Sequence, residues 1–141
     1  MIAIKLCIFS LLMFSILLAA CNSDGIVVSP SITVGGQEQE IGYIGYVADQ
    51  SEVDNNEPPS IYQNVEPYTI KPNTIIELNY EEVPKKVVLK QWVNNKLEKE
   101  EELPDFSFTS PSEEGMYIYS IGQRWNFRTA SSVVIVLNVN R

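Results

Sequence analysis

Few side chains in this sequence could act as nucleophiles or as metal ligands. The 141 residues include no histidine and two cysteines, Cys7 and Cys21. Without histidine, the Ser-His-Asp and Cys-His arrangements of hydrolases and most zinc sites are excluded. Acidic residues are numerous, so a carboxylate pair of the glycosidase kind stays open by residue type, but no pair stands in a marked sequence context. The sequence therefore predicts a protein that is not an enzyme and that uses no cofactor.

The thiol of Cys21 is the reactive group with the most informative surroundings. It directly follows Leu18, Ala19 and Ala20, which end an apolar run over residues 6–18. A run of about 13 residues is too short to span a bilayer, which needs roughly 20, but it matches the apolar core of a secretory signal. Small side chains before a scissile bond fit a signal peptidase, and a cysteine thiol can be alkylated to a thioether.

These four residues resemble the lipobox of bacterial lipoproteins, in which a large aliphatic residue and two small residues precede a cysteine. The resemblance implies that residues 1–20 are a signal peptide that is removed and that Cys21 carries a diacylglycerol. Residues 21–29 would then be a lipidated tether at the extracytoplasmic face of a cell membrane. Two other interpretations stay open, namely an ordinary signal peptide that leaves Cys21 as a free thiol, and a buried apolar helix.

The charge balance bears on the partners of the protein. The chain has 10 basic and 18 acidic residues, a net charge of -8, and this excess argues against a nucleic-acid partner, which would need clustered Lys and Arg. Cleavage after Ala20 would remove Lys5 and Cys7, which leaves 9 basic against 18 acidic residues and no disulfide. An acidic body is repelled by an anionic leaflet, so we expect the membrane contact to come from the lipid and not from a basic surface.

The rest of the chain, residues 30–141, predicts a single all-β domain. Short β-rich segments alternate with turn residues, and no stretch keeps a helical period. We expect about seven strands, packed as one antiparallel β-sandwich. The expected β-rich or extended segments are 32–34, 41–48, 61–70, 74–80, 87–93, 106–108, 116–125 and 132–139. Between them, residues 94–105 are expected to form a charged loop with one helical turn over residues 97–102.

One segment of the predicted sandwich has a specific resemblance. Residues 114–119 (EGMYIY), followed by Trp125 and a closing strand, resemble the penultimate strand of immunoglobulin-like domains. The resemblance implies that Tyr117 folds over a corner and donates its hydroxyl to the backbone. It also implies that Trp92, inside an earlier strand, is the core tryptophan of such a sandwich.

The wider layout is similar to a group of small, poorly characterised Gram-positive lipoproteins. The similarity rests on spaced Pro, Ile, Gly and Tyr residues within residues 30–35, 72–76 and 111–117. Residues 45–48 depart from the group's pattern, because its Cys and Trp are missing there. An excess of Ile, Asn and Lys over Ala also favours a Gram-positive source. The similarity implies a fold and a cellular location, and it implies no activity.

Aromatic and acidic residues are the candidates for a binding surface. Tyr62 and Trp125 are the aromatics expected on an exposed patch, while the others are expected in the core. The acidic run at residues 98–102 could bind a cationic peptide or could be a solvated turn. The polar loop at residues 49–60 could offer oxygen ligands to calcium from Asp49, Asp54, Asn55, Asn56 and Glu57. Its spacing does not match an EF-hand, so we expect no metal site.

These observations predict a non-enzymatic lipoprotein that acts as a binding or accessory module at the membrane surface. Its partners would be the membrane, through the lipid anchor, and a protein or peptide. A second possibility is a protective lipoprotein that captures a cationic extracellular peptide, which the acidic composition would attract.

Overall fold

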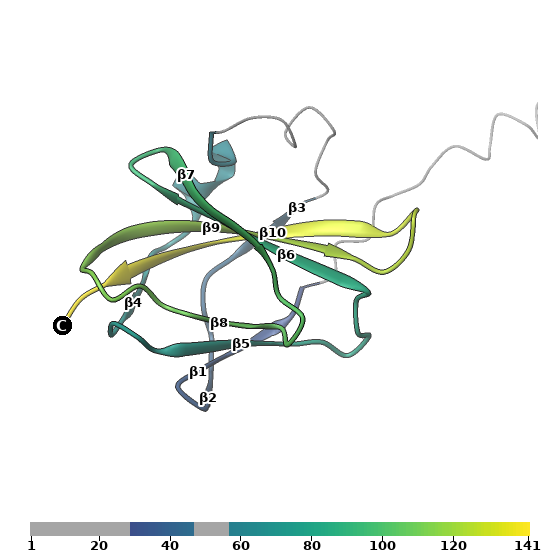
Figure 1. The fold of residues 1–141 in the computed structure, drawn as a ribbon, viewed down its shortest axis with the longest axis horizontal. Coiled ribbons are helices and arrows are strands. Elements are labelled where there is room, and N and C mark those ends of the chain that lie inside the picture. The colour runs from purple at the N-terminus through teal and green to yellow at the C-terminus, as the bar shows by residue number, and fades with distance from the viewer. Residues whose placement is uncertain (1–28, 47–56) are drawn as a thin grey trace, which may run out of the picture.

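The computed structural model describes residues 29–46 and 57–141, apart from the side chain of Tyr46. These residues form ten strands and one 3-10 helix, and the strands make two sheets packed face to face (Figure 1). The elements are β1 (Ser31–Val34), β2 (Gln37–Gln39), β3 (Ile44–Tyr46), η3 (Ser60–Asn64), β4 (Tyr68–Ile70), β5 (Ile75–Asn79), β6 (Lys86–Val93), β7 (Lys96–Glu102), β8 (Ser107–Thr109), β9 (Gly115–Arg124) and β10 (Ala130–Val139).

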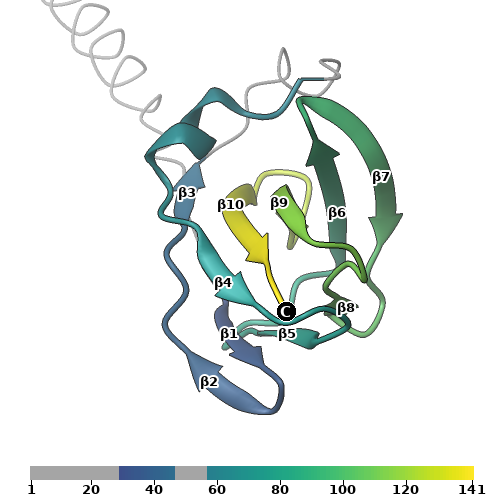
Figure 2. The same ribbon diagram turned by 90° about the vertical axis from the view of Figure 1, so that its left-hand side faces the viewer.

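The two sheets differ in size and share an antiparallel plan. The smaller sheet has the order β2-β1-β5-β8, and the larger sheet has the order β3-β10-β9-β6-β7. Strand β4 adds to the larger sheet beside β10, in parallel, and Figure 2 shows these two strands running side by side. The all-β sandwich is therefore confirmed, with ten strands in the described part of the chain where about seven were expected. Four of the ten, β2, β3, β4 and β8, are only three residues long.

The main hydrophobic core lies between the two sheets. In β5 the side chains alternate, so that Ile76 and Leu78 are buried while Ile75 and Glu77 are exposed. This alternation confirms the strand expected over residues 74–80, and it places one face of the strand against the opposite sheet. The fully buried Tyr119 of β9 belongs to the same core.

A second hydrophobic cluster covers the outer face of the larger sheet. Val65, Ile118, Val134 and Val136 are buried there together with Trp92. The side chains of Ile61 and Tyr62, which lie in η3, pack against this cluster from outside. The larger sheet is consequently apolar on both faces, and η3 serves as its outer cover.

The position of Trp92 corrects one expectation. Trp92 is buried, with 3% of its surface exposed, but it lies in the outer cluster and not between the sheets. Val87 and Leu89 of the same strand point into the main core. Because successive side chains of a strand alternate between its faces, Trp92 falls on the opposite face from these two residues. The resemblance to the core tryptophan of immunoglobulin-like domains therefore does not hold for its position.

A turn of two asparagines overturns the predicted loop at residues 94–105. Asn94 and Asn95 have φ values of 50° and 62°, the left-handed conformation that both central residues of a type I′ hairpin turn require. Strand β7 follows at once and pairs with β6 in antiparallel register. The helical turn expected over residues 97–102 is therefore wrong. The segment is rich in charged residues and lacks the alternation of apolar and polar residues that usually predicts a strand.

Two further segments differ from expectation in detail. Residues 61–70 were expected to be extended, but they open with the 3-10 helix η3 before β4 begins at Tyr68. Of the strand expected over residues 41–48, the structure has β3 at Ile44–Tyr46, and residues 47–48 lie outside the described part. The β1–β2 hairpin turns at Gly35 and Gly36, which have positive φ values of 57° and 82°.

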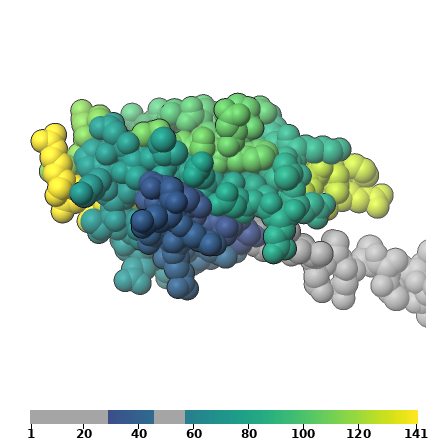
Figure 3. Space-filling view, turned by 90° about the horizontal axis from the view of Figure 1, so that it is seen from below, coloured from purple at the N-terminus to yellow at the C-terminus, as the bar shows by residue number. Residues whose placement is uncertain are grey.

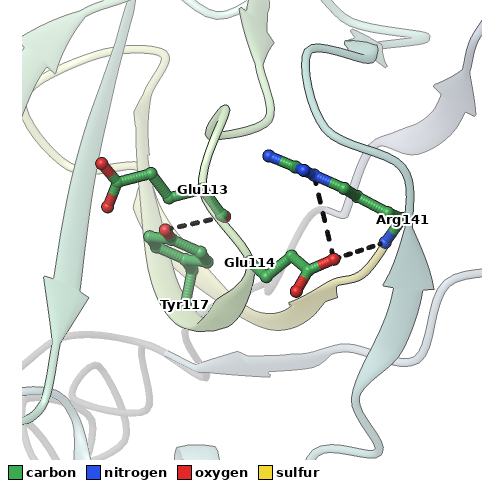
Figure 4. A network of polar contacts seen from close by, with 4 residues as sticks. All are labelled: Glu113, Glu114, Tyr117 and Arg141. Atoms are coloured by element: carbon green, nitrogen blue, oxygen red, sulfur yellow. Dashed lines mark hydrogen bonds and ion pairs between the residues drawn. The ribbon is translucent and has the colours of Figure 1, made fainter.

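Strand β9 begins at a corner held by side-chain contacts, shown in Figure 4. The hydroxyl of Tyr117 donates a hydrogen bond to the carbonyl oxygen of Glu113 at 3.0 Å, as the resemblance implied. Beside it, the Glu114 carboxylate accepts a hydrogen bond from the backbone N–H of Arg141 at 3.2 Å. These contacts join the start of β9 to the end of the chain beyond β10.

The Tyr117 corner should contribute measurably to stability. Substitution Tyr117→Phe removes the hydrogen bond to Glu113 and keeps the ring, so the free energy of unfolding should fall by about 0.5–1.5 kcal/mol. Tyr43→Phe is the matched control, because Tyr43 is 44% exposed. Urea unfolding of both variants measures the difference. Equal stability of the two variants would contradict a stabilising role for the corner.

Buried tyrosines should make the fold sensitive to high pH. Burial raises the pKa of Tyr119 well above its usual value of 10, and its hydroxyl has no hydrogen-bond partner among the described residues. The folded state therefore holds the proton more tightly than the unfolded state, so the free energy of unfolding should be constant at neutral pH and fall as the pH rises above about 10.

The Tyr119→Phe substitution should weaken this alkaline dependence. One tyrosine contributes a slope of about 1.4 kcal/mol per pH unit above its unfolded pKa, and the variant should lose this contribution. Urea unfolding between neutral pH and about pH 11 measures the slope for the parent, for Tyr119→Phe and for the exposed control Tyr43→Phe. A variant whose stability fell as steeply as that of the parent would rule out Tyr119 as the source.

Candidate functional site

Three connections meet at one end of the sandwich. They are the β5–β6, β7–β8 and β9–β10 loops, each taken with its adjoining strand-end residue Lys86, Glu102 or Arg124, which gives residues 80–86, 102–106 and 124–129. We call this the hairpin end, because the β9–β10 hairpin forms its tip. In the space-filling view of Figure 3 this hairpin projects at the right, away from the C-terminus at the left. The opposite end, where β9 begins, is called the far end.

Trp125 joins two of these connections. Its indole Nε1 donates a hydrogen bond to the carbonyl oxygen of Glu82 at 2.8 Å, although 43 residues separate the two positions. Beside it, the backbone N–H of Lys85 donates to the carbonyl oxygen of Arg124 at 2.8 Å. The β5–β6 loop and the β9–β10 hairpin are therefore held together by one side-chain bond and one backbone bond.

An aromatic cluster supports the hairpin end from inside. The ring of Tyr80 meets the rings of Phe106 and Trp125 edge-on, with centroid distances of 5.5 Å and 6.3 Å. Such edge-to-face contacts stabilise a pair beyond the area that it buries. Burial also raises the pKa of the Tyr80 hydroxyl far above its usual value. Each of the three connections supplies one ring to this cluster.

The tip of the hairpin is fixed in shape but exposes a large apolar ring. The Asn126 side-chain oxygen accepts hydrogen bonds from the backbone N–H groups of Arg128 and Thr129, both at 2.8 Å. The backbone N–H of Trp125 donates to the carbonyl oxygen of Thr129. Asparagine commonly closes turns in this way. At the apex Phe127 is 82% exposed, and the guanidinium carbon of Arg128 lies 5.0 Å from its ring centroid.

A second exposed apolar side chain lies on the neighbouring loop. Val83 is 63% exposed and follows Glu82, whose carbonyl binds Trp125. Burial of these side chains against a binding partner would be favourable, because it removes apolar surface from water. Phe127 and Val83 thus give the hairpin end an apolar character on loops that are already held in place.

The hairpin end is balanced in charge, unlike the rest of the described protein. Its connections carry four basic and four acidic residues, Lys85, Lys86, Arg124, Arg128, Glu81, Glu82, Glu102 and Asp105. The other described residues hold ten acidic side chains against five basic ones. The acidic excess of the described residues therefore lies outside the hairpin end.

The two aromatics predicted for a binding patch have different positions. Trp125 is 6% exposed, so it is buried beneath the hairpin end, and its expected exposure is wrong. Tyr62 is half-buried over the outer cluster and its hydroxyl lies 3.4 Å from the side-chain oxygen of Asn95. The structure does not bring Tyr62 and Trp125 together. Sequence reasoning missed Phe127, although its position in the short segment between two clear strand patterns was a signal for a turn tip.

The acidic run at residues 98–102 forms most of edge strand β7. Glu100 and Glu102 pair with lysines of the neighbouring strand β6, Lys90 and Lys86, at 3.7 Å and 3.5 Å. Glu101 pairs with Lys99 at 2.6 Å on the same strand. These exposed pairs add little stability, but they neutralise part of the charge and leave an edge that other strands will not readily extend. Lys86 and Lys90 lie on β6, an interior strand between β9 and β7.

The remaining predicted sites lie elsewhere. Leu18, Ala19, Ala20 and Cys21 are outside the described residues. Within the described residues, no three His, Cys, Asp or Glu side chains converge as metal ligands, and no helix has the length and apolar character to cross a bilayer. The chain matches no known protein family and no curated protein sequence. The geometry on the described residues thus offers an apolar, charge-balanced surface for non-covalent binding at the hairpin end.

The Trp125 hydrogen bond should keep the β5–β6 loop closed. Substitution Trp125→Phe removes the donor to the Glu82 carbonyl, so the backbone amides of residues 81–86 should exchange with deuterium at least several-fold faster. Trp92→Phe is the matched control, since the Nε1 of Trp92 has no hydrogen-bond partner among the described residues. Hydrogen exchange followed by mass spectrometry measures both variants. Equal exchange of this loop in the two variants would show that the bond does not hold it.

Proposed function

We propose that this protein is a lipid-anchored lipoprotein of the extracytoplasmic membrane face, whose β-sandwich is a non-enzymatic binding or accessory module. The observation that carries the proposal is the sequence Leu18-Ala19-Ala20-Cys21 behind a short apolar run. A cysteine at this point can be alkylated and then become the first residue of the mature chain. Two or three acyl chains together give stable anchoring, whereas one chain binds a bilayer reversibly.

The arrangement of the strands supports an immunoglobulin-like type of sandwich. The order β1-β5-β8 faces the order β7-β6-β9-β10-β4, with β4 parallel to the last strand. β5 and β8 lie in the smaller sheet, and the pairs β6–β7 and β9–β10 lie in the larger sheet. This order of crossing between sheets suits such domains, in which a tyrosine corner opens the penultimate strand. The Tyr117 hydroxyl bond at the start of β9 fits this role.

A binding role suits both the exposed loops and the tether. Sandwiches of this type commonly present their binding residues on the loops that join the strands at one end. The hairpin end carries exposed apolar side chains on loops that hydrogen bonds already order, which lowers the entropy lost on binding. Attachment to a surface raises the effective concentration of the module, so that a weak partner is met often.

Lipidation can be tested directly with one variant and one matched control. Mass spectrometry of the protein purified from bacterial membranes should find residues 1–20 absent and a diacylglycerol thioether on Cys21. The Cys21→Ala variant should keep its signal segment or leave the membrane fraction. The Cys7→Ala variant, which also loses one thiol, should be processed and anchored like the parent.

Inhibition of the lipoprotein signal peptidase by globomycin gives an independent measurement. A precursor that retains residues 1–20 should accumulate in treated cells. An unmodified thiol at position 21, or a mature product with the first twenty residues still attached, would overturn the proposal.

A further inference from the structure

The chain enters the sandwich at the hairpin end. Ser31, the first residue of β1, pairs with Asn79, the last residue of β5, and the β5–β6 loop begins directly after it. Pro30, just before the strand, is buried, so the entry point is fixed against the domain. The first described residue, Ser29, therefore lies at the end of the domain where Phe127 and Val83 are exposed.

The length of the tether places this end close to an anchored lipid. Residues 22–29 span at most about 28 Å when fully extended, at about 3.5 Å per residue. The described domain extends along strands of up to ten residues, as β9 and β10 show, and the far end lies at the other extreme of these strands. An anchor on Cys21 thus favours contact of the membrane with the hairpin end over contact with the far end.

The side chains at the hairpin end fit the surface of a lipid bilayer. An exposed aromatic ring can enter the region of the headgroups, and arginine or lysine side chains beside it can bind lipid phosphates. Phe127 supplies the ring, Arg128 lies against it, and Arg124 and Lys85 stand at the base of the same hairpin. The balance of charge at this end also keeps electrostatic repulsion from an anionic leaflet lower here than on the acidic remainder.

We propose that the hairpin end docks on the phospholipid surface, with Phe127 inserted among the headgroups and Arg124, Arg128 and Lys85 against lipid phosphates. The docking rests on the proposed lipid anchor, and it gives the domain a defined orientation. The far end, with the start of β9 and the β6–β7 turn, then faces away from the membrane, and the lipid surface is the ligand that the exposed loops of the hairpin end bind.

The depth of a fluorescent label in the bilayer shows which end of the domain faces the membrane. The anchored full chain is reconstituted into vesicles of phosphatidylglycerol and phosphatidylcholine, after an NBD label is attached to a Phe127→Cys variant. The matched control is a Met116→Cys variant, because Met116 is 50% exposed and lies at the far end on the same strand pair. Nitroxide lipids labelled near the headgroup should quench the label at position 127 roughly twofold or more beyond the label at position 116.

Charge reversal tests the role of the basic side chains. The double substitution Arg124→Glu and Arg128→Glu in the Val83→Cys variant, labelled at position 83, should reduce quenching there to the level seen at position 116. The control Lys71→Glu and Lys96→Glu makes the same change of net charge at the far end and should leave the quenching at position 83 unchanged. Equal loss in both double variants would show a general charge effect and would overturn the specific docking.

Flotation of the vesicles separates failure of the docking from failure of the anchor. A full chain that does not float with the vesicles overturns the anchor. A chain that floats while position 127 is quenched no more than position 116 leaves the anchor intact and overturns the docking. A label at position 127 that is shielded from water in native membranes but not in protein-free vesicles would also overturn lipid docking, since a membrane protein would then cover the hairpin end.

Discussion

The structure depends on the burial of strand β10 on both faces and along both edges. Residues 131–137 of this strand are all buried, and the run Val133–Leu137 contains only large apolar side chains. One face meets the main core between the sheets and the other meets the outer cluster. β9 pairs along one edge, while β3 and β4 divide the other edge between them. A strand of this composition would drive aggregation if an edge or a face were left open.

This requirement explains why the N-terminal third of the domain has its irregular path. After the β1–β2 hairpin the chain crosses to the larger sheet, where β3 covers the first half of β10 in antiparallel direction. The chain returns through η3, which covers the outer cluster, and β4 then pairs in parallel with the second half. Each of these short elements satisfies hydrogen bonds or covers apolar area that β9 and β10 leave exposed. Edge β7, in contrast, is protected by its own charges.

The two ends of the sandwich have different physical characters because of how their loops are held. At the far end, polar contacts between Tyr117, Glu113, Glu114 and Arg141 close the corner. At the hairpin end, aromatic packing and the Trp125 bond order the loops from below, which leaves Phe127 and Val83 exposed above. An ordered loop that exposes a phenylalanine loses little entropy on docking, since its backbone is already fixed. The membrane orientation that we propose follows from this difference between the ends.

The sequence by itself determined the features that depend on near neighbours along the chain. The alternation in β5 and the glycine turn between β1 and β2 were predictable, because strand period and turn chemistry are local properties. The corner at Tyr117 was expected from the resemblance of residues 114–119 to a strand of immunoglobulin-like domains. Only the tertiary structure decided which side chains are covered. Trp125 is hidden because the β5–β6 loop lies over it, and Trp92 is hidden because η3 covers the outer face of the larger sheet. Strand β7 likewise exists because β6 offers it a partner, despite a composition typical of a loop. The burial of these side chains depends on segments that are distant in the chain, and no local pattern of residues specifies which distant segment packs against them.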